Sequence, residues 1–223
     1  MKSVFASGLC AALLCTAAMA ADIPVKAPPA ALPVPFSWTG WYVGGYGGYL
    51  NGYTTDSNPV LPNAGGQSWY VGVIGGYRYQ LANNVVLGIS VDAPLWASKE
   101  TVSIFGAFPN TVKFKGGVNG QGMVGYAIGR FLPYVSAGIG AARVSAQEII
   151  PPIASPWVTN THLLTMVGFG MQYAVTDHWI AGVAYNHVVA SKETYNCGPV
   201  VCGVVGQIGL ISDTVTGVVE YRF

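Results

Sequence analysis

The first twenty residues contain the one stretch of this chain that is long and apolar enough to form a membrane-spanning helix. Residues 4–20 follow Lys2 and end in Ala18-Met19-Ala20, which is the charged, apolar and small-residue order of a secretory signal peptide. We predict cleavage after Ala20, with an uncleaved N-terminal anchor as the alternative.

The remaining chain is too apolar for a typical soluble domain. Of the 223 residues of the full sequence, 52% are hydrophobic and 9% are charged, whereas soluble domains carry about 25% charged residues. Backbone groups inside a bilayer must bond to one another, so only helices and closed barrels span it. Because no helical span remains, the chain is predicted to cross the outer membrane as a β-barrel. A soluble β-sandwich or barrel is the alternative, but its exposed face would be polar.

Three regions follow from this interpretation. Residues 1–20 are the signal peptide, residues 21–38 a Pro-rich periplasmic linker, and residues 39–223 the outer-membrane β-barrel. The linker begins "ADIPVKAPPAALPVP", which holds five prolines and no periodicity, as expected of an extended segment.

The fold class is predicted as all-β, an eight-stranded antiparallel transmembrane β-barrel. Barrel strands alternate lipid-facing and lumen-facing residues over about ten positions. Such segments are expected at residues 39–50, 68–80, 84–95, 112–126, 132–144, 162–174, 179–188 and 211–223. The connections alternate long and short, the short ones being "LANN", "AIGRF" and "VTDH", which matches long extracellular loops and short periplasmic turns. A further hairpin in residues 191–209 would instead give ten strands.

The alternation also assigns the two faces of the wall. Aromatic residues near segment ends are expected in the interfacial girdles, and glycines in the interior, because an eight-stranded barrel is just wide enough for side chains to fill. The charged lumen residues would have to pair with one another, so we expect a plugged lumen. The predicted lumen polar residues are Arg78, Asp92, Gln121, Gln172, Glu220 and Arg222.

Signatures of chemistry are weak. The GxSxG, HExxH and P-loop motifs do not occur, so no catalytic residue, metal site or cofactor is expected. A net charge near zero argues against a nucleic-acid partner. A lipid hydrolase that uses His187 and Ser191 is a weak alternative. A haemin site that uses Tyr195, His187 or His162 is another. Cys197 and Cys202 are expected to form a disulfide, since an exported protein meets an oxidising space.

Several motifs in order resemble one family. "WTGWYVGGYGGY", "GYAIGRFLPYVSAGIG" and the terminal "VEYRF" resemble the small porin-like outer-membrane proteins of alphaproteobacteria, often called outer-membrane immunogenic proteins. The resemblance implies an eight-stranded barrel with a structural or antigenic role; some members bind haemin and some are described as porins. Phe223, with Tyr221 and Val219, resembles the C-terminal signal read by the barrel-assembly machinery. Gln172 departs from the family, which commonly has an acid there.

The function expected from these observations is that of a non-enzymatic outer-membrane protein contributing to envelope structure and surface exposure. Its expected partners are outer-membrane lipid and, during biogenesis, the barrel-assembly machinery. Two alternatives remain open at this point. One is a narrow porin for small solutes, and the other is a surface receptor that binds haemin or a host molecule through its loops.

Overall fold

The computed structural model describes residues 36–56, 65–98, 100–102, 110–150, 153–154, 156–195 and 206–223. The predicted signal peptide, its cleavage after Ala20 and most of the predicted linker therefore lie outside the described residues, as do Cys197 and Cys202. Within the described ranges, no helix is long and apolar enough to span a membrane.

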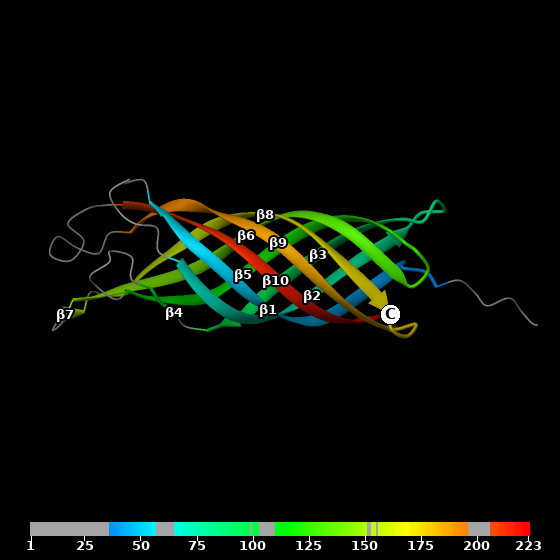
Figure 1. Cartoon of the computed structure of the whole chain (residues 1–223), viewed down its shortest axis with the longest axis horizontal. Helices are drawn as coiled ribbons and strands as arrows, with labels where there is room; N and C mark the ends of the chain where they lie inside the picture. Colours follow the sequence, from blue (N-terminus) through cyan, green and yellow to red (C-terminus); the bar gives the residue numbers. More distant parts are fainter. Residues whose placement is uncertain are drawn as a thin grey trace, which may run out of the picture. The chain divides into compact units, whose positions relative to one another are not determined.

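The described part of the chain forms ten strands in antiparallel order (Figure 1). They are β1 Gly40–Asp56, β2 Gly65–Gln80, β3 Val85–Ala97, β4 Glu100–Val102, β5 Asn110–Tyr126, β6 Phe131–Ile150, β7 Ile153–Ala154, β8 Val158–Ala174, β9 Trp179–Tyr195 and β10 Gly206–Arg222. Apart from the short β4 and β7, which pair only with β5 and β6 respectively, each strand has two neighbours in the ring, and the pairing of β1 with β10 closes it. The fold is a closed eight-stranded antiparallel β-barrel, as predicted.

Short turns join the strands at one end of the barrel. Residues 81–84, 127–130 and 175–178 make the connections β2–β3, β5–β6 and β8–β9. In the first of them, the Asn84 amide donates to the Leu81 carbonyl at 3.0 Å, and Asn84 itself has a φ of 66°. Asparagine tolerates this left-handed conformation better than most residues. The C-terminus lies at the same end (Figure 1), in agreement with an even strand count.

The strands begin close to their predicted positions at the short-turn end but extend further at the other end. The first segment was expected to stop at residue 50 and continues to Asp56. The fifth continues past residue 144 to Ile150, and the seventh past residue 188 to Tyr195. In these extensions the ladder runs on among polar residues, where the lipid no longer imposes an apolar outer face.

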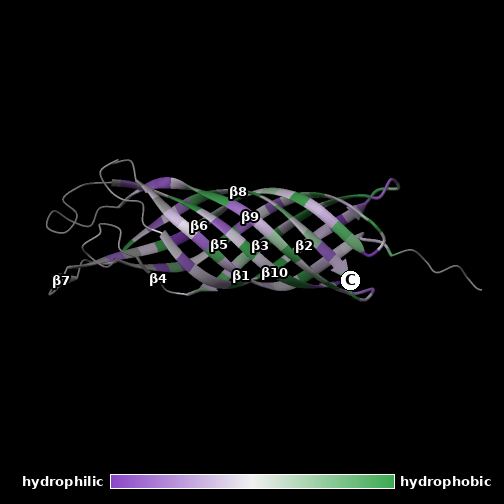
Figure 2. Ribbon diagram, in the orientation of Figure 1, coloured by the Kyte–Doolittle hydropathy of each residue, from purple (hydrophilic) through white to green (hydrophobic). Residues whose placement is uncertain are grey.

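The two faces of the wall alternate residue by residue, and Figure 2 shows the resulting bands of hydrophobic and hydrophilic colour along the strands. On β10, Val215 and Val219 are exposed, whereas Thr214 and Glu220 are buried. Arg78 on β2 is buried as well. The outward residues form the lipid-facing surface, and the inward residues fill the lumen.

Inward tyrosines lie against inward glycines of the next strand. A Cβ added at Gly76 would come within 2.6 Å of the Tyr42 hydroxyl oxygen and 2.3 Å of the Ile89 carbonyl oxygen. A Cβ at Gly72 would come within 2.4 Å of the Tyr46 ring. Glycine at these positions therefore provides the space that the two rings occupy, which explains the mixture of aromatic residues and glycine at the start of the barrel.

An apolar plug fills the lumen at the short-turn end. Trp38, Val86, Leu132 and Ile180 are each 0% exposed and belong to one cluster, against which Phe36 packs. Trp38 is fixed at both ends, because its amide donates to Gln80 Oε1 at 2.8 Å and its indole Nε1 to the Gly129 carbonyl at 3.1 Å. Phe36 and Trp38, which the sequence places in the linker, thus pack within the barrel.

Candidate functional site

A buried ion pair crosses the lumen above the plug. The Arg78 guanidinium donates to Glu220 Oε2 at 2.7 Å, and the two side chains are 2% and 1% exposed. Gln172 Nε2 donates to the other carboxylate oxygen at 3.1 Å. Arg78 also lies over the Tyr42 ring, 3.7 Å from its centroid. We call Arg78, Glu220 and Gln172 the lower polar layer; its residues come from β2, β10 and β8.

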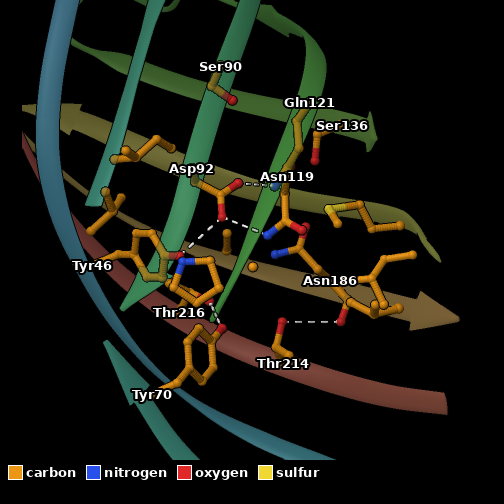
Figure 3. Close-up of a pocket in the computed structure, with 18 of the residues that line it drawn as sticks. Tyr46, Tyr70, Ser90, Asp92, Asn119, Gln121, Ser136, Asn186, Thr214 and Thr216 are labelled. Carbon is orange, nitrogen blue, oxygen red and sulfur yellow. Dashed lines mark hydrogen bonds between the residues drawn. The ribbon is translucent and has the colours of Figure 1, made fainter. Parts of the chain in front are cut away.

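Asp92 on β3 is the centre of a second polar group, nearer the long connections. Its Oδ2 accepts hydrogen bonds from the Tyr46 hydroxyl at 3.1 Å and Asn119 Nδ2 at 2.8 Å. Its Oδ1 accepts one from Gln121 Nε2 at 3.2 Å. Figure 3 shows the three donors converging on the carboxylate from β1 and β5. This upper polar layer is held by neutral amide and hydroxyl donors.

The expectation that all the lumen charges pair with one another is therefore wrong for two of them. Asp92 stands opposite Ile74, four positions along β2 from Arg78, which places it about 13 Å further along the strand at 3.3 Å per residue. Arg222 lies at the short-turn end, where its guanidinium donates to the Asp177 carbonyl at 2.9 Å and to that of Ser37. Register along the strands, rather than charge, decides these partners.

A cavity of about 290 Å³ occupies the lumen on both sides of the upper polar layer. Polar residues line its middle, including Asp92, Asn119 and Gln121, as Figure 3 shows. Beyond them, toward the long connections, the lining becomes apolar. That apolar part includes Leu50, Pro94, Phe114, Val144, Leu164 and Leu210.

His187 and Ser191, the pair suggested for catalysis, do not contact each other through their side chains. His187 Nδ1 lies 2.8 Å from Asp213 Oδ1, whereas the Ser191 hydroxyl donates to Glu193 Oε1 at 2.8 Å. His162 is 0% exposed, with its Nδ1 2.9 Å from the Ser191 carbonyl oxygen. The side chain of Tyr195 lies outside the described residues. In the ranges that the structure covers, no cluster of three or more His, Cys, Asp or Glu side chains could hold a metal ion.

The C-terminal residues lie on the outer wall. Val219 and Phe223 are exposed, and the Tyr221 ring packs edge-on against both Trp179 and Phe223, with centroids 5.3 Å apart in each case. The Phe223 amide donates to the Trp41 carbonyl at 3.0 Å and so extends the β1–β10 seam. The residues of the suggested assembly signal are thus part of the aromatic girdle at the short-turn end.

A closed barrel with an apolar outer wall, an aromatic girdle and a polar lumen defines a small integral outer-membrane β-barrel protein. The chain belongs to the outer membrane protein beta-barrel domain family, whose profile matches residues 8–223. It is located in the cell outer membrane.

Two outer-membrane proteins of Brucella are similar in sequence to this chain. The chain is 33% identical over 220 residues to the 31 kDa outer-membrane immunogenic protein of Brucella melitensis. The alignment covers 86% of this chain and 89% of the relative. It is 27% identical over 186 residues to the 25 kDa outer-membrane immunogenic protein of Brucella canis, with 80% of each chain covered. Among solved structures, neisserial surface protein A aligns with a TM-score of 0.49 at 13% identity, covering 83% of this chain and 98% of that one.

Proposed function

We propose that this protein is a non-enzymatic structural barrel of the outer membrane, which strengthens the envelope and presents its long connections at the cell surface. The observation that carries the proposal is the plug. An ion crossing the barrel would have to pass Trp38, Leu132 and Ile180, which are all 0% exposed.

The lower polar layer supports the same conclusion. Arg78 and Glu220 neutralise each other within a closed, buried contact, so neither charge is available to attract a passing ion. A selective pore would need charged groups that remain accessible along its axis. The plug and the lower polar layer together favour a structural barrel over a narrow porin.

Surface presentation is supported by the long connections and by the relatives' names, which describe immunogenic outer-membrane proteins. A receptor for haemin is less favoured by the described residues, since His162 is buried and His187 is engaged with Asp213. Outer-membrane lipid is the partner of the apolar wall, and the barrel-assembly machinery is the expected partner during insertion.

Planar-bilayer conductance tests whether the lumen is closed. Residues 21–223 are refolded in detergent, and a heat-dependent gel shift verifies the barrel before reconstitution. We expect no discrete current steps from the wild type, and steps from a variant that combines Trp38→Gly with Arg78→Ala and Glu220→Ala and still shows the gel shift, because both the plug and the lower polar layer close the lumen. Trp41→Gly is the matched control, because Trp41 is 65% exposed on the outer wall. Reproducible steps from the wild-type barrel would move the protein to the porin class.

Epitope insertion tests surface presentation. A tag placed within residues 57–64, between β1 and β2, is expected to bind antibody on intact cells. The same tag placed in the turn at residues 127–130 should bind only after the outer membrane is permeabilised. Antibody labelling at residues 127–130 on intact cells would contradict the proposed orientation. A lack of labelling at residues 57–64 on intact cells would contradict it as well.

A further inference from the structure

The hydrogen-bonded wall of the barrel is interrupted between β3 and β5. Their ladder runs from Val85 opposite Tyr126 to Asp92 opposite Asn119. Pairing resumes further along, where Glu100 of β4 stands opposite Val112. Among the residues that the structure describes in between, 93–98 on one side and 113–118 on the other, no ladder pair joins the two strands.

Both strands carry an irregularity beside this interruption. The register of β3 against β2 shifts between Val71 and Gly72, and that of β5 against β6 shifts between Phe114 and Gly116. Gly116 has a φ of 128°, a conformation that residues with a Cβ rarely adopt. Bulges bend a strand and turn its edge away from its neighbour. The interruption is therefore encoded in both strands.

The interruption contains a groove on the barrel wall. The groove is lined by Trp96, Ala97, Ser98, Lys113, Phe114 and Lys115. Ala97 and Phe114 also line the lumen cavity, so these two side chains stand between the groove and the apolar part of the lumen. We call the groove, with residues 93–98 and 113–118 on its sides, the lateral portal.

The height of the lateral portal places it at the boundary of the outer leaflet. Asp92, at its lower edge, is seven residues along β3 from Val85, which amounts to about 18 Å of rise for a strand tilted by about 40°. The apolar band of such barrels is about 25 Å tall. Trp96 is exposed beside the portal, as expected of an interfacial aromatic residue.

Two lysines, Lys113 and Lys115, line the groove of the portal. Lys113 Nζ lies 3.8 Å from the centroid of the Trp157 ring, and Lys115 is exposed at the groove. Two lysines at headgroup level, beside a groove that only Ala97 and Phe114 separate from an apolar space, match a molecule with an anionic head and an apolar tail.

We propose that the lateral portal binds a fatty acid. Its carboxylate lies between Lys113 and Lys115, and its alkyl chain passes Ala97 and Phe114 into the apolar part of the lumen. A single-chain ligand is favoured because the whole lumen cavity, of which the apolar part is only a portion, has a volume of about 290 Å³, just below the roughly 300–1,000 Å³ of ligand pockets. A lipid with several chains would not fit this space.

Photo-crosslinking in vesicles tests the proposal on the intact barrel. The barrel is reconstituted in phosphatidylcholine vesicles, with folding verified by the heat-dependent gel shift, and exposed to dodecanoic acid carrying a terminal diazirine. Mass spectrometry then locates the label. We expect label on the lumen residues Phe114, Val144 and Leu164, in addition to background label on lipid-facing Ile89 and Ile139. Label confined to the lipid-facing residues would overturn the proposal.

Two variants separate the headgroup site from the passage. The double variant Lys113→Glu with Lys115→Glu should lower the lumen label about tenfold or more, since two charge-assisted contacts are lost, while the background label stays constant. Lys192→Glu, an exposed charge reversal on β9, is the matched control and should change neither the lumen label nor the background label. Ala97→Trp should remove the lumen label by filling the passage. Undiminished lumen label in the double variant, or equal label from the corresponding diazirine alcohol, would refute the carboxylate site.

Discussion

The ion pair of the lower polar layer gives the sharpest energetic prediction. Replacing Glu220 by Gln keeps the shape of the side chain but removes the charge that neutralises Arg78, whose side chain is 2% exposed. Two of its guanidinium nitrogens, Nε and Nη1, already have no hydrogen-bond partner among the described residues. Removing one partner of a buried pair typically costs about 3–5 kcal/mol. The contact with the Tyr42 ring remains, so we expect a loss near the lower limit, about 3 kcal/mol.

Urea unfolding in phosphatidylcholine vesicles measures this loss, with tryptophan fluorescence and the gel shift as probes. A loss of about 3 kcal/mol corresponds to roughly a hundredfold change in the folding equilibrium. Asp177→Asn is the matched control, because the Arg130–Asp177 pair is 40% and 71% exposed, and such surface pairs contribute about 0–1 kcal/mol. The double variant Arg78→Met with Glu220→Gln should recover most of the loss, since no uncompensated charge remains. Equal stability of Glu220→Gln and the wild type would refute the argument.

Three further predictions concern the plug, the C-terminal residue and the two cysteines. Trp38→Ala should lower the free energy of unfolding by about 3–5 kcal/mol, because it empties a buried aromatic site; a change below that of Trp41→Ala in urea unfolding would contradict this. Deletion of Phe223 should reduce the amount of barrel in outer-membrane fractions, and unchanged levels would refute its role in assembly. Cys197 and Cys202 should form a disulfide, detectable as a cross-linked peptide in non-reducing mass spectrometry. Reducing the disulfide should lower the free energy of unfolding in urea by about 2 kcal/mol. Two free thiols in the exported protein would disprove the prediction.

The strands were predictable because lipid, turns and lumen each leave a local signal in the sequence. The alternation of apolar and polar residues predicted that Arg78 and Glu220 face the lumen. The short connections predicted where β3, β6 and β9 begin. The extension of β1 to Asp56 and of β9 to Tyr195 was not predictable from alternation. Beyond the membrane the outer face of the barrel need not be apolar. Strand pairing therefore continues there although the sequence shows no alternation of apolar and polar residues.

The lumen contacts were less accessible from the sequence. Alternation assigned Asp92 to the lumen, but its donors Tyr46 and Asn119 are 46 and 27 residues away and are selected by strand register and barrel closure. Trp38 had no periodic signal at all, since it enters the lumen from outside the wall strands. Its position directly after a Pro-rich segment made it resemble linker. A bulky aromatic residue just before the first barrel strand is the one hint that the sequence offered.

The plug also has a consequence for the order of events in barrel formation. Trp38 packs against Val86 of β3, Leu132 of β6 and Ile180 of β9, which are far apart in an open sheet and meet only when the sheet has curled into a ring. On a partly built sheet only one side of this site exists, since Gln80 and Val86 lie near β1 whereas Leu132 and Ile180 come from β6 and β9. The Trp38 side chain therefore becomes fully buried only after β1 and β10 have paired, and its burial then stabilises the closed ring.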